Sequence, residues 1–329
     1  MQPQSMNQAL DLSIVIINWN SVGLLRQCLR TVYANISGVA SEIIVIDNAS
    51  YDGCAEMVVA EFPSVRFFQS ERNLGFAAAN NVCAERATGR NLLFLNPDTE
   101  ILGSALQAML ACIDAKKDAG AVGPKLLNSD GSLQVTCLQP YPSVMNQLVG
   151  AARLQAMFPK WSVWGNGVLF EEDSRPRPVE GVVGACMMVD AGAFREVGGF
   201  HTGYFMYAED MDLCYKLEKT GRTNYYVGTA SVVHHGGSSS GRQADPHFST
   251  IVMRDSIQSF MRIHRGPVYA TFFRSLTALA ALIRMGLLTV PLLLPVDAER
   301  RRQLRHSFGK WLRVFRWAIG NQTLVRRAA

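Results

Sequence analysis

The sequence lacks the features that identify several common classes of protein. Its seven cysteines are scattered and include no C-x-x-C pair, which is typical of a reducing compartment rather than of a disulfide-bonded secreted protein. The N-terminal stretch MQPQSMNQALDLS has neither the basic nor the apolar region of a signal peptide. We therefore expect a cytoplasmic protein.

Two nucleotide-binding signatures are also missing. No G-x-G-x-x-G follows the first predicted strand, and no G-x-x-x-x-G-K-[ST] occurs in the 329 residues. The sequence therefore supports neither dinucleotide redox chemistry nor a P-loop. A nucleotide would have to be held in another way.

Short β-rich apolar runs alternate with helical patterns in the first part of the chain. Strands are expected over residues 12–17, 42–46, 65–69 and 91–95, and helices over residues 23–33, 53–61 and 76–87. This alternation predicts an α/β fold with a doubly wound, mostly parallel sheet. Ligands of such sheets bind beyond the carboxyl ends of the strands.

Polar side chains follow three of these strands where each strand ends. The motifs are N-W-N at residues 18–20, D-N at residues 47–48 and N-P-D at residues 96–98. Each motif alone is more simply a turn, because Asn, Asp and Pro are common loop residues. Three of them at one edge of a parallel sheet indicate a binding site.

Two later segments contain further candidates. A strand over residues 182–189 leads through glycine-rich sequence to a helix that opens at Glu209 and Asp210. Acidic residues there complement the helix dipole, but a desolvated carboxylate beside aromatic residues can also serve as a general base. Another strand ends at His234 and His235, before a Gly/Ser loop, where a histidine is either structural or a metal ligand.

Six motifs, in this order, resemble those of the family 2 glycosyltransferases of GT-A fold, in particular the bacterial rhamnosyltransferase-like branch. Within residues 12–240 they are INWN, VIDNAS, RNLGFAAANN, FLNPD, GGF-x-x-x-YFMYAEDMDLC and VVHHGGSSSG. The resemblance implies an inverting, metal-dependent glycosyltransferase. The donor it implies is a nucleotide sugar, dTDP-rhamnose or a UDP-sugar, with L-rhamnose as the expected sugar.

The resemblance also assigns residues to the donor site. It implies that Asn18 and Asn20 line the nucleoside pocket and that Asp47 forms a hydrogen bond with the pyrimidine ring. It places four more residues near the ribose or the diphosphate: Arg72, Asn73, Gly75 and Asn80.

The metal site and the catalytic base follow from the same resemblance. The N-P-D motif stands in the place of the family's DxD-type motif, so Asp98 and His234 would hold Mg²⁺ or Mn²⁺ against the donor's diphosphate. Asn96 belongs to the donor site, where it replaces a first acidic residue. Asp210 would be the catalytic base that accepts the acceptor's hydroxyl proton, with Glu209 as its alternative.

The C-terminal residues differ in composition from the rest of the chain. From residue 297 to the end, nine Lys or Arg side chains outnumber two acidic ones, so this segment has a charge of +7 and the remainder −2. We expect an anionic membrane surface as its partner, and no nucleic acid. Residues 269–296 are apolar but contain Arg274 and Arg284, which favours a helix lying in the membrane interface over a single span.

These patterns together predict a catalytic domain over residues 1–265 and a helical tail over residues 266–329. The nucleotide half would cover about residues 10–125, and the acceptor half about residues 126–265. The expected acceptor is a lipid-linked saccharide or a growing surface polysaccharide at the inner face of the cytoplasmic membrane. Two alternatives remain open, a sugar-nucleotide pyrophosphorylase and a catalytically silent glycan-binding module.

Overall fold

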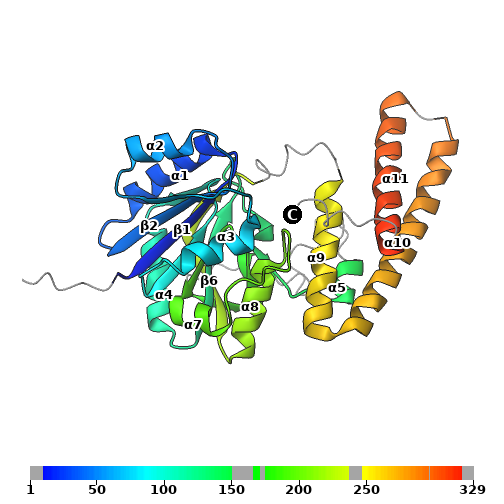
Figure 1. The fold of residues 1–329 in the computed structure, drawn as a ribbon. Helices are drawn as coiled ribbons and strands as arrows, with labels where there is room; N and C mark the ends of the chain where they lie inside the picture. Colours follow the sequence, from blue (N-terminus) through cyan, green and yellow to red (C-terminus); the bar gives the residue numbers. More distant parts are fainter. Residues whose placement is uncertain (1–9, 150–165, 171–174, 237–246, 296, 321–329) are drawn as a thin grey trace, which may run out of the picture. The chain divides into compact units, whose positions relative to one another are not determined.

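The computed structural model describes residues 10–149, 166–170, 175–236, 247–295 and 297–320. The predicted Gly/Ser loop beyond residue 236, the N-terminal residues 1–9 and the basic residues Arg326 and Arg327 lie outside this part. The chain forms two compact units (Figure 1). The sheet unit comprises residues 1–141, 159–203 and 209–242, and the helical unit comprises residues 142–158, 204–208 and 243–329.

A nine-stranded mixed sheet forms the centre of the sheet unit, with the order β3-β2-β1-β4-β10-β6-β11-β5 and with β8 beside β11. Its strands are β1 (Leu12–Asn18), β2 (Ser41–Asp47), β3 (Arg66–Gln69), β4 (Asn91–Leu95), β5 (Thr99–Leu102), β6 (Ala119–Leu127), β8 (Arg177–Val179), β10 (Cys186–Asp190) and β11 (Thr223–His234). β3, β2, β1 and β4 run parallel, whereas β10 and β5 are antiparallel to their neighbours. The predicted α/β fold is confirmed.

Helices cover this sheet because its central strands are apolar on both faces. Every residue of β1 and of β4 is buried, as continuous runs of Ile, Val and Leu require. The helices of the unit are α1 (Val22–Asn35), α2 (Cys54–Glu61), α3 (Gly75–Ala84), α4 (Ala105–Ala115), α7 (Ala191–Glu196) and α8 (Glu209–Lys219). All seven cysteines are free and buried, as the sequence predicts.

One predicted strand is wrong in its extent. Residues 182–189 form not one strand but the end of β9 (Gly181–Val182), a short connection and most of β10, while β9 pairs with β7 (Leu138–Gln139) in a small second sheet. The connection leaves the ladder because its backbone bonds elsewhere. Gly184 N–H donates to the Asp210 carboxylate, and Ala185 C=O accepts from Asn96 N–H, both at 2.9 Å.

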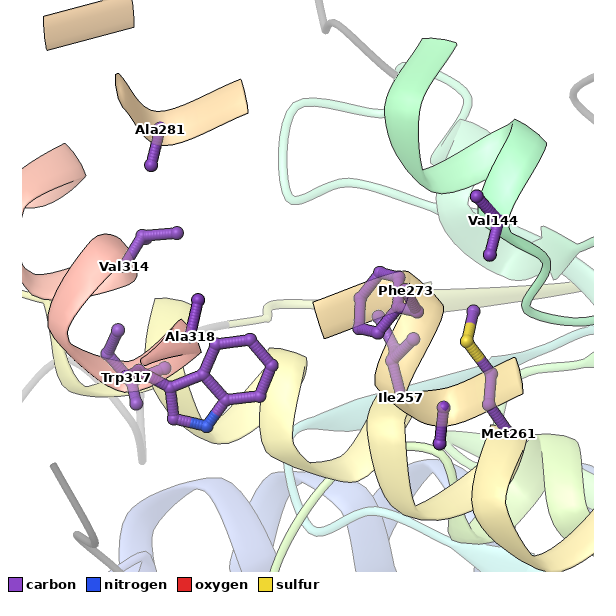
Figure 2. Close-up of a cluster of buried hydrophobic side chains, with 10 residues drawn as sticks. Val144, Ile257, Met261, Phe273, Ala281, Val314, Trp317 and Ala318 are labelled. Atoms are coloured by element: carbon purple, nitrogen blue, oxygen red, sulfur yellow. The ribbon is translucent and has the colours of Figure 1, made fainter. Parts of the chain in front are cut away.

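Four helices make up the described part of the helical unit: α5 (Val144–Val149), α9 (Phe248–Arg265), α10 (Pro267–Leu293) and α11 (Ala298–Ala318). They share one apolar core, which Figure 2 shows and which consists of Val144, Ile251, Ile257, Met261, Ala270, Phe273, Ala281, Val314, Trp317 and Ala318. The predicted domain boundary at residues 265/266 therefore differs from the observed division. α9 lies with the tail because its apolar face packs against α10.

The two arginines within the apolar helix α10 both lie against α11. Arg274 donates to the terminal carbonyls of α11, at 2.9 Å to Ala318 and 2.7 Å to Trp317, and Arg284 lies 4.4 Å from the centre of the Trp311 ring. By length and composition alone, α10 could cross a membrane. Only 17% of its most apolar window is buried within the protein, unlike the core helix of a soluble protein. Its exposed apolar side chains include Val268, Phe272, Leu279, Ile283, Leu287 and Val290.

Candidate active site

The ends of β1 and β2 bring Asn18 and Asp47 together. The two residues are paired in the parallel ladder, and Asn18 Nδ2 donates to Asp47 Oδ1 at 2.9 Å. The same amide nitrogen faces Ser50 Oγ and Asp52 Oδ1, both at 3.2 Å, so three oxygens fix the orientation of the amide. Asn18 Oδ1 is buried and has no hydrogen-bond partner within the described residues.

Asp47 is held as a carboxylate by several donors. The backbone N–H groups of Ser50 and Tyr51 donate to its Oδ2 at 3.1 Å, and Gln69 Nε2 donates to the same oxygen at 2.8 Å. Burial acts to raise the pKa of Asp47, but these hydrogen bonds outweigh it and lower the pKa below its usual value. Asp47 is therefore ionised and fixed at neutral pH.

Asn48 connects the end of β2 to the loop before α3, a role that the D-N motif alone does not reveal. Its Oδ1 accepts from Leu74 N–H at 2.7 Å, and its Nδ2 donates to Asn73 Oδ1 at 3.0 Å. Asn73 Oδ1 also accepts from Gly75 N–H at 2.8 Å, and Gly75 has a φ of 77°, which glycine adopts without strain. The candidate loop before α3 is thus attached to the end of β2.

Three other predicted donor-site residues have different surroundings. Asn20 and Arg72 are exposed, and Asn20 has a φ of 52°, which asparagine tolerates better than most residues. Asn80 is buried, and its amide donates to Phe76 C=O of its own helix at 3.0 Å. The following residue, Asn81, exchanges two hydrogen bonds with the backbone of Phe200, at 2.8 and 2.9 Å.

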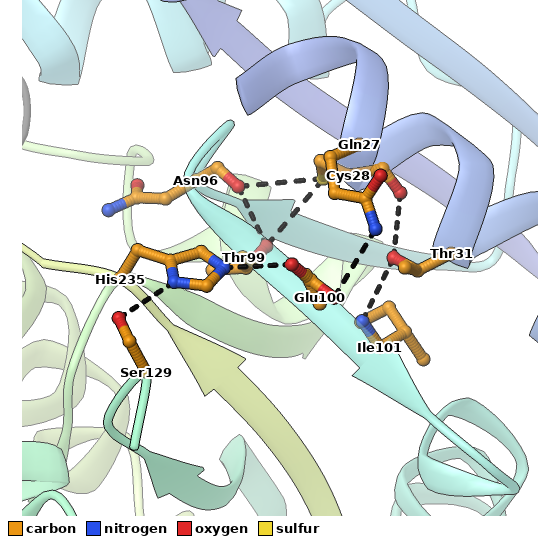
Figure 3. Close-up of polar contacts among 9 residues, drawn as sticks. All are labelled: Gln27, Cys28, Thr31, Asn96, Thr99, Glu100, Ile101, Ser129 and His235. Atoms are coloured by element: carbon orange, nitrogen blue, oxygen red, sulfur yellow. Dashed lines mark hydrogen bonds and ion pairs between the residues drawn. The ribbon is translucent and has the colours of Figure 1, made fainter. Parts of the chain in front are cut away.

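α1 fixes the segment that follows β4, as Figure 3 shows. Thr99 Oγ1 donates to the Asn96 carbonyl at 2.7 Å, and the Cys28 thiol lies 3.6 Å from the same oxygen. Ile101 N–H donates to Thr31 Oγ1 at 3.0 Å. The N-P-D turn is therefore held in place, and the chain continues directly into β5.

β5 positions Asp98 beside His234, because it pairs with β11 with Thr99 opposite His234. His235 N–H donates to the backbone carbonyl of Asp98 at 2.9 Å, and His234 Nε2 lies 3.5 Å from Asp98 Oδ1. On the other side of the ring, His234 Nδ1 lies 2.8 Å from Gln134 Oε1. Since that oxygen can only accept, Nδ1 bears a proton, and Nε2 is the ring nitrogen that faces Asp98.

The neighbouring histidine has a different role. His235 Nε2 lies 2.8 Å from Glu100 Oε1, and its Nδ1 lies 2.8 Å from Ser129 Oγ (Figure 3). Both of its ring nitrogens are occupied by protein partners. His235 therefore connects β11, β5 and the loop after β6 (Ala119–Leu127), whereas His234 is the one suited to a metal.

The acidic pair at the start of α8 contains two carboxyl groups in different environments. Asp210 is partly exposed and accepts from the backbone N–H groups of Gly184 at 2.9 Å and of Met211 at 2.8 Å. Glu209 is 7% exposed, and its Oε2 has no hydrogen-bond partner within the described chain. Burial and, second, the charge of Asp210 raise the pKa of Glu209 to about 8.

Burial also raises the pKa of Asp210, against the opposing effect of the two backbone donors. Hydrogen bonds to the charged form favour ionisation, and Asp210 accepts two of them from backbone N–H groups. The two carboxyl groups thus differ in their hydrogen bonding: backbone donors fix Asp210, whereas Glu209 Oε2 has no partner within the described residues. The connection between β9 and β10 joins this pair to the N-P-D turn, since Gly184 contacts Asp210 and Ala185 contacts Asn96.

A second acidic group lies near the nucleoside pocket. Single ligand atoms of Asp47, Asp52 and Cys54 all lie within 4.8 Å of one another. Asp47 is already saturated by donors, Asp52 Oδ2 accepts from Val22 N–H at 2.8 Å, and burial raises the pKa of the Cys54 thiol. These atoms stabilise the loop after β2 and are a poorer match for a metal than Asp98 and His234.

Comparison with known proteins agrees with this arrangement. The model of glycosyl transferase family 2 matches residues 13–197, and that of glycosyl transferase family group 2 matches residues 134–326. The N-acetylglucosaminyl-diphospho-decaprenol L-rhamnosyltransferase of Mycobacterium tuberculosis is 32% identical over 223 residues, which cover 63% of this chain and 70% of that protein. The rhamnosyltransferase WbbL of Escherichia coli is 27% identical over 171 residues, 49% of this chain and 61% of that one.

Solved structures show the fold. The mannosyltransferase PcManGT of Pyrobaculum calidifontis, in complex with GDP-Man and Mn²⁺, has a TM-score of 0.55 at 15% identity over 97% of this chain and 90% of its own. GalNAc-T7 with UDP, GalNAc and Mn²⁺ has a TM-score of 0.60 at 16% identity, over 97% of this chain and 59% of its own. The protein is thus an α/β glycosyltransferase of GT-A fold. The chain belongs to glycosyl transferase family 2, in its rhamnosyltransferase-like branch.

Proposed function

We propose that this enzyme transfers L-rhamnose from a nucleoside-diphosphate donor to a lipid-linked saccharide, with inversion and with the help of a divalent cation. The sugar and the lipid-linked acceptor are supported by the names of the two rhamnosyltransferase relatives, one of which acts on a diphospho-decaprenol. The observation that carries the proposal is the arrangement of Asp98, His234 and Asp210 around one edge of the sheet. A sugar-nucleotide pyrophosphorylase is not favoured by any of these comparisons.

The nucleoside would bind at the ends of β1 and β2. Asn18 Oδ1 is a buried acceptor without a donor among the residues that the structure describes, and such an atom is costly unless a ligand satisfies it. The N–H of a pyrimidine ring supplies that donor. Asn18 is held by Asp47, so the acceptor is already oriented before the ligand arrives.

Asp98 and His234 fit a divalent cation. Adjacent ligands of an octahedral Mg²⁺ or Mn²⁺ lie about 3 Å apart, given bonds of about 2.1 Å. The 3.5 Å between Asp98 Oδ1 and His234 Nε2 is close to that separation, and Gln134 orients the ring as outer partners of metal-bound histidines do. Such an ion, completed by donor phosphates and water, would neutralise charge on the departing diphosphate.

Asp210 would act as the general base. Its carboxylate is oriented by two backbone N–H groups, which favour its charged form against the effect of burial. It would accept the proton of the acceptor hydroxyl as the oxygen attacks the anomeric carbon from the side opposite the diphosphate. The sugar is thereby transferred with inversion, and the nucleoside diphosphate leaves.

The helical unit would hold the enzyme at the inner face of the cytoplasmic membrane. The exposed side of α10 is apolar over several turns, and α11 carries several exposed arginines. An apolar face flanked by cations is suited to acyl chains and anionic headgroups. We propose that α10 lies in the interface, with a single span as the alternative.

The test is a panel of nucleotide sugars, including dTDP-rhamnose, offered to the full-length enzyme with a lipid-linked acceptor while released nucleoside diphosphate is measured. Asp210→Asn should keep donor binding and slow transfer by about 10²- to 10⁴-fold, the usual value of general-base catalysis. Asp130→Asn makes the same change in an exposed turn and serves as the control. Near wild-type transfer by Asp210→Asn would remove Asp210 from this role.

A further inference from the structure

Three cations from three helices surround one tryptophan in the helical unit. Measured to the centre of the Trp311 ring, Arg284 of α10 lies at 4.4 Å, Arg254 of α9 at 5.6 Å and Lys310 of α11 at 5.7 Å. All four side chains are partly exposed. The helices converge here although like charges repel one another, so the arrangement calls for a physical explanation.

Among the described residues of the helical unit, few acids are available to balance the charge of this cluster. Within the described residues of the helical unit, the acidic side chains are Asp255, Asp297 and Glu299. Asp255 accepts from the Trp317 indole N–H at 3.1 Å, and Asp297 caps α11 by accepting from Arg300 N–H at 2.7 Å. Asp297 and Glu299 lie about 20 Å from Trp311 along the axis of α11.

The ionisation of the cluster reflects this imbalance. Burial and, second, the charge of Arg284 lower the pKa of Arg254 to about 10. Burial and the charges of Arg254 and Arg284 lower the pKa of Lys310. The two guanidinium groups stay cationic because arginine is not deprotonated in proteins, and contact with the indole face offsets only part of the repulsion within the cluster. An anion placed among them would be attracted by all three.

We propose that Arg254, Arg284 and Lys310 form a binding site for the diphosphate of a membrane amphiphile, namely the group that joins the acceptor's saccharide to its lipid. Guanidinium groups match phosphate oxygens in pairs, and two of them beside an ammonium suit two linked phosphates. The lipid chain would pack along α10, because the exposed apolar side chains of Ile283 and Leu287 adjoin Arg284. This inference rests on the proposed lipid-linked acceptor.

The experiment measures binding of farnesyl diphosphate to the full-length protein in nanodiscs of neutral phosphatidylcholine. Arg284→Gln combined with Lys310→Gln should weaken that binding at least about tenfold, because two charge-assisted contacts are lost. Arg262→Gln combined with Lys117→Gln removes the same charge from exposed positions outside the cluster and should change binding less than about twofold. Lys310→Gln alone, the milder variant, keeps the test valid if the double variant unfolds.

One further measurement distinguishes a lipid diphosphate from a headgroup phosphate as the ligand. Another distinguishes failure of this binding site from failure of the proposed function. Nanodiscs of phosphatidylglycerol, without farnesyl diphosphate, report headgroup binding. The diphosphate site is overturned if the cluster variants lose only binding to phosphatidylglycerol. It is also overturned if they bind farnesyl diphosphate as the wild type does. Release of nucleoside diphosphate from the donor by the wild type is followed in parallel. Its absence would contradict the proposed function, even where farnesyl diphosphate binding depends on the cluster.

Discussion

Replacing Gln134 by leucine should weaken the metal site without touching either candidate ligand. Gln134 Oε1 lies 2.8 Å from His234 Nδ1, and Gln134 Nε2 donates to Asn128 Oδ1 at 3.1 Å, which fixes the amide. Leucine has a similar size but no acceptor. The imidazole would then lose the partner that selects its tautomer and its orientation toward Asp98.

The expected magnitude follows from this role. Outer partners of metal-bound histidines typically contribute 10- to 100-fold in metal affinity, or about 1.4 to 2.7 kcal/mol. Gln134→Leu should raise the Mn²⁺ concentration for half-maximal transfer by about that factor, with a smaller effect on the rate at saturating Mn²⁺. Gln134→Glu keeps an acceptor oxygen for Nδ1–H and should retain most of the affinity.

Mn²⁺ titrations of the transfer rate, together with direct Mn²⁺ binding by electron paramagnetic resonance in the presence of nucleoside diphosphate, provide the measurement. Ser129→Ala removes the equivalent 2.8 Å contact to His235 and is the matched control. The reasoning would be refuted by an unchanged Mn²⁺ requirement in Gln134→Leu. An equal shift in Ser129→Ala, or full activity in EDTA, would also contradict it.

Two further predictions concern stability. Because the Glu209 pKa is about 8 in the folded protein against an ordinary 4.5, the folded state binds the extra proton between these values, so stability falls as the pH rises through this range. Glu209→Gln should therefore raise the melting temperature more at pH 8.5 than at pH 5, and a constant difference would argue against a protonated Glu209. Phe273 is 2% exposed in the core of the helical unit, whereas Phe272 beside it is 54% exposed. Phe273→Ala should cost about 3–5 kcal/mol of unfolding free energy in chemical denaturation and Phe272→Ala under about 1 kcal/mol, and similar losses would contradict the assigned core.

The local sequence was sufficient for the first elements of the sheet unit. Apolar runs bounded by polar turns predicted β1, β2, β3 and β4 and the helices between them, because strand and helix periods are properties of neighbouring residues. The same runs predicted that Asn18, Asp47 and Asn96 lie at strand ends, since parallel strands present their carboxyl ends at one edge. The family resemblance also favoured His234 over His235 as the metal ligand, which stays a prediction.

Only the tertiary structure decided which distant groups meet. Residues 99–102 pair with β11, and this places Asp98 beside His234, 136 positions later in the chain. The hydrogen bond from Gln134 to the same histidine and the clamp of Asn81 on Phe200 likewise join separate segments. The break between β9 and β10 depends on Asp210, and the cations around Trp311 come from three helices. No local period encodes such contacts, because they depend on strand order, register and helix packing, which the whole chain settles together.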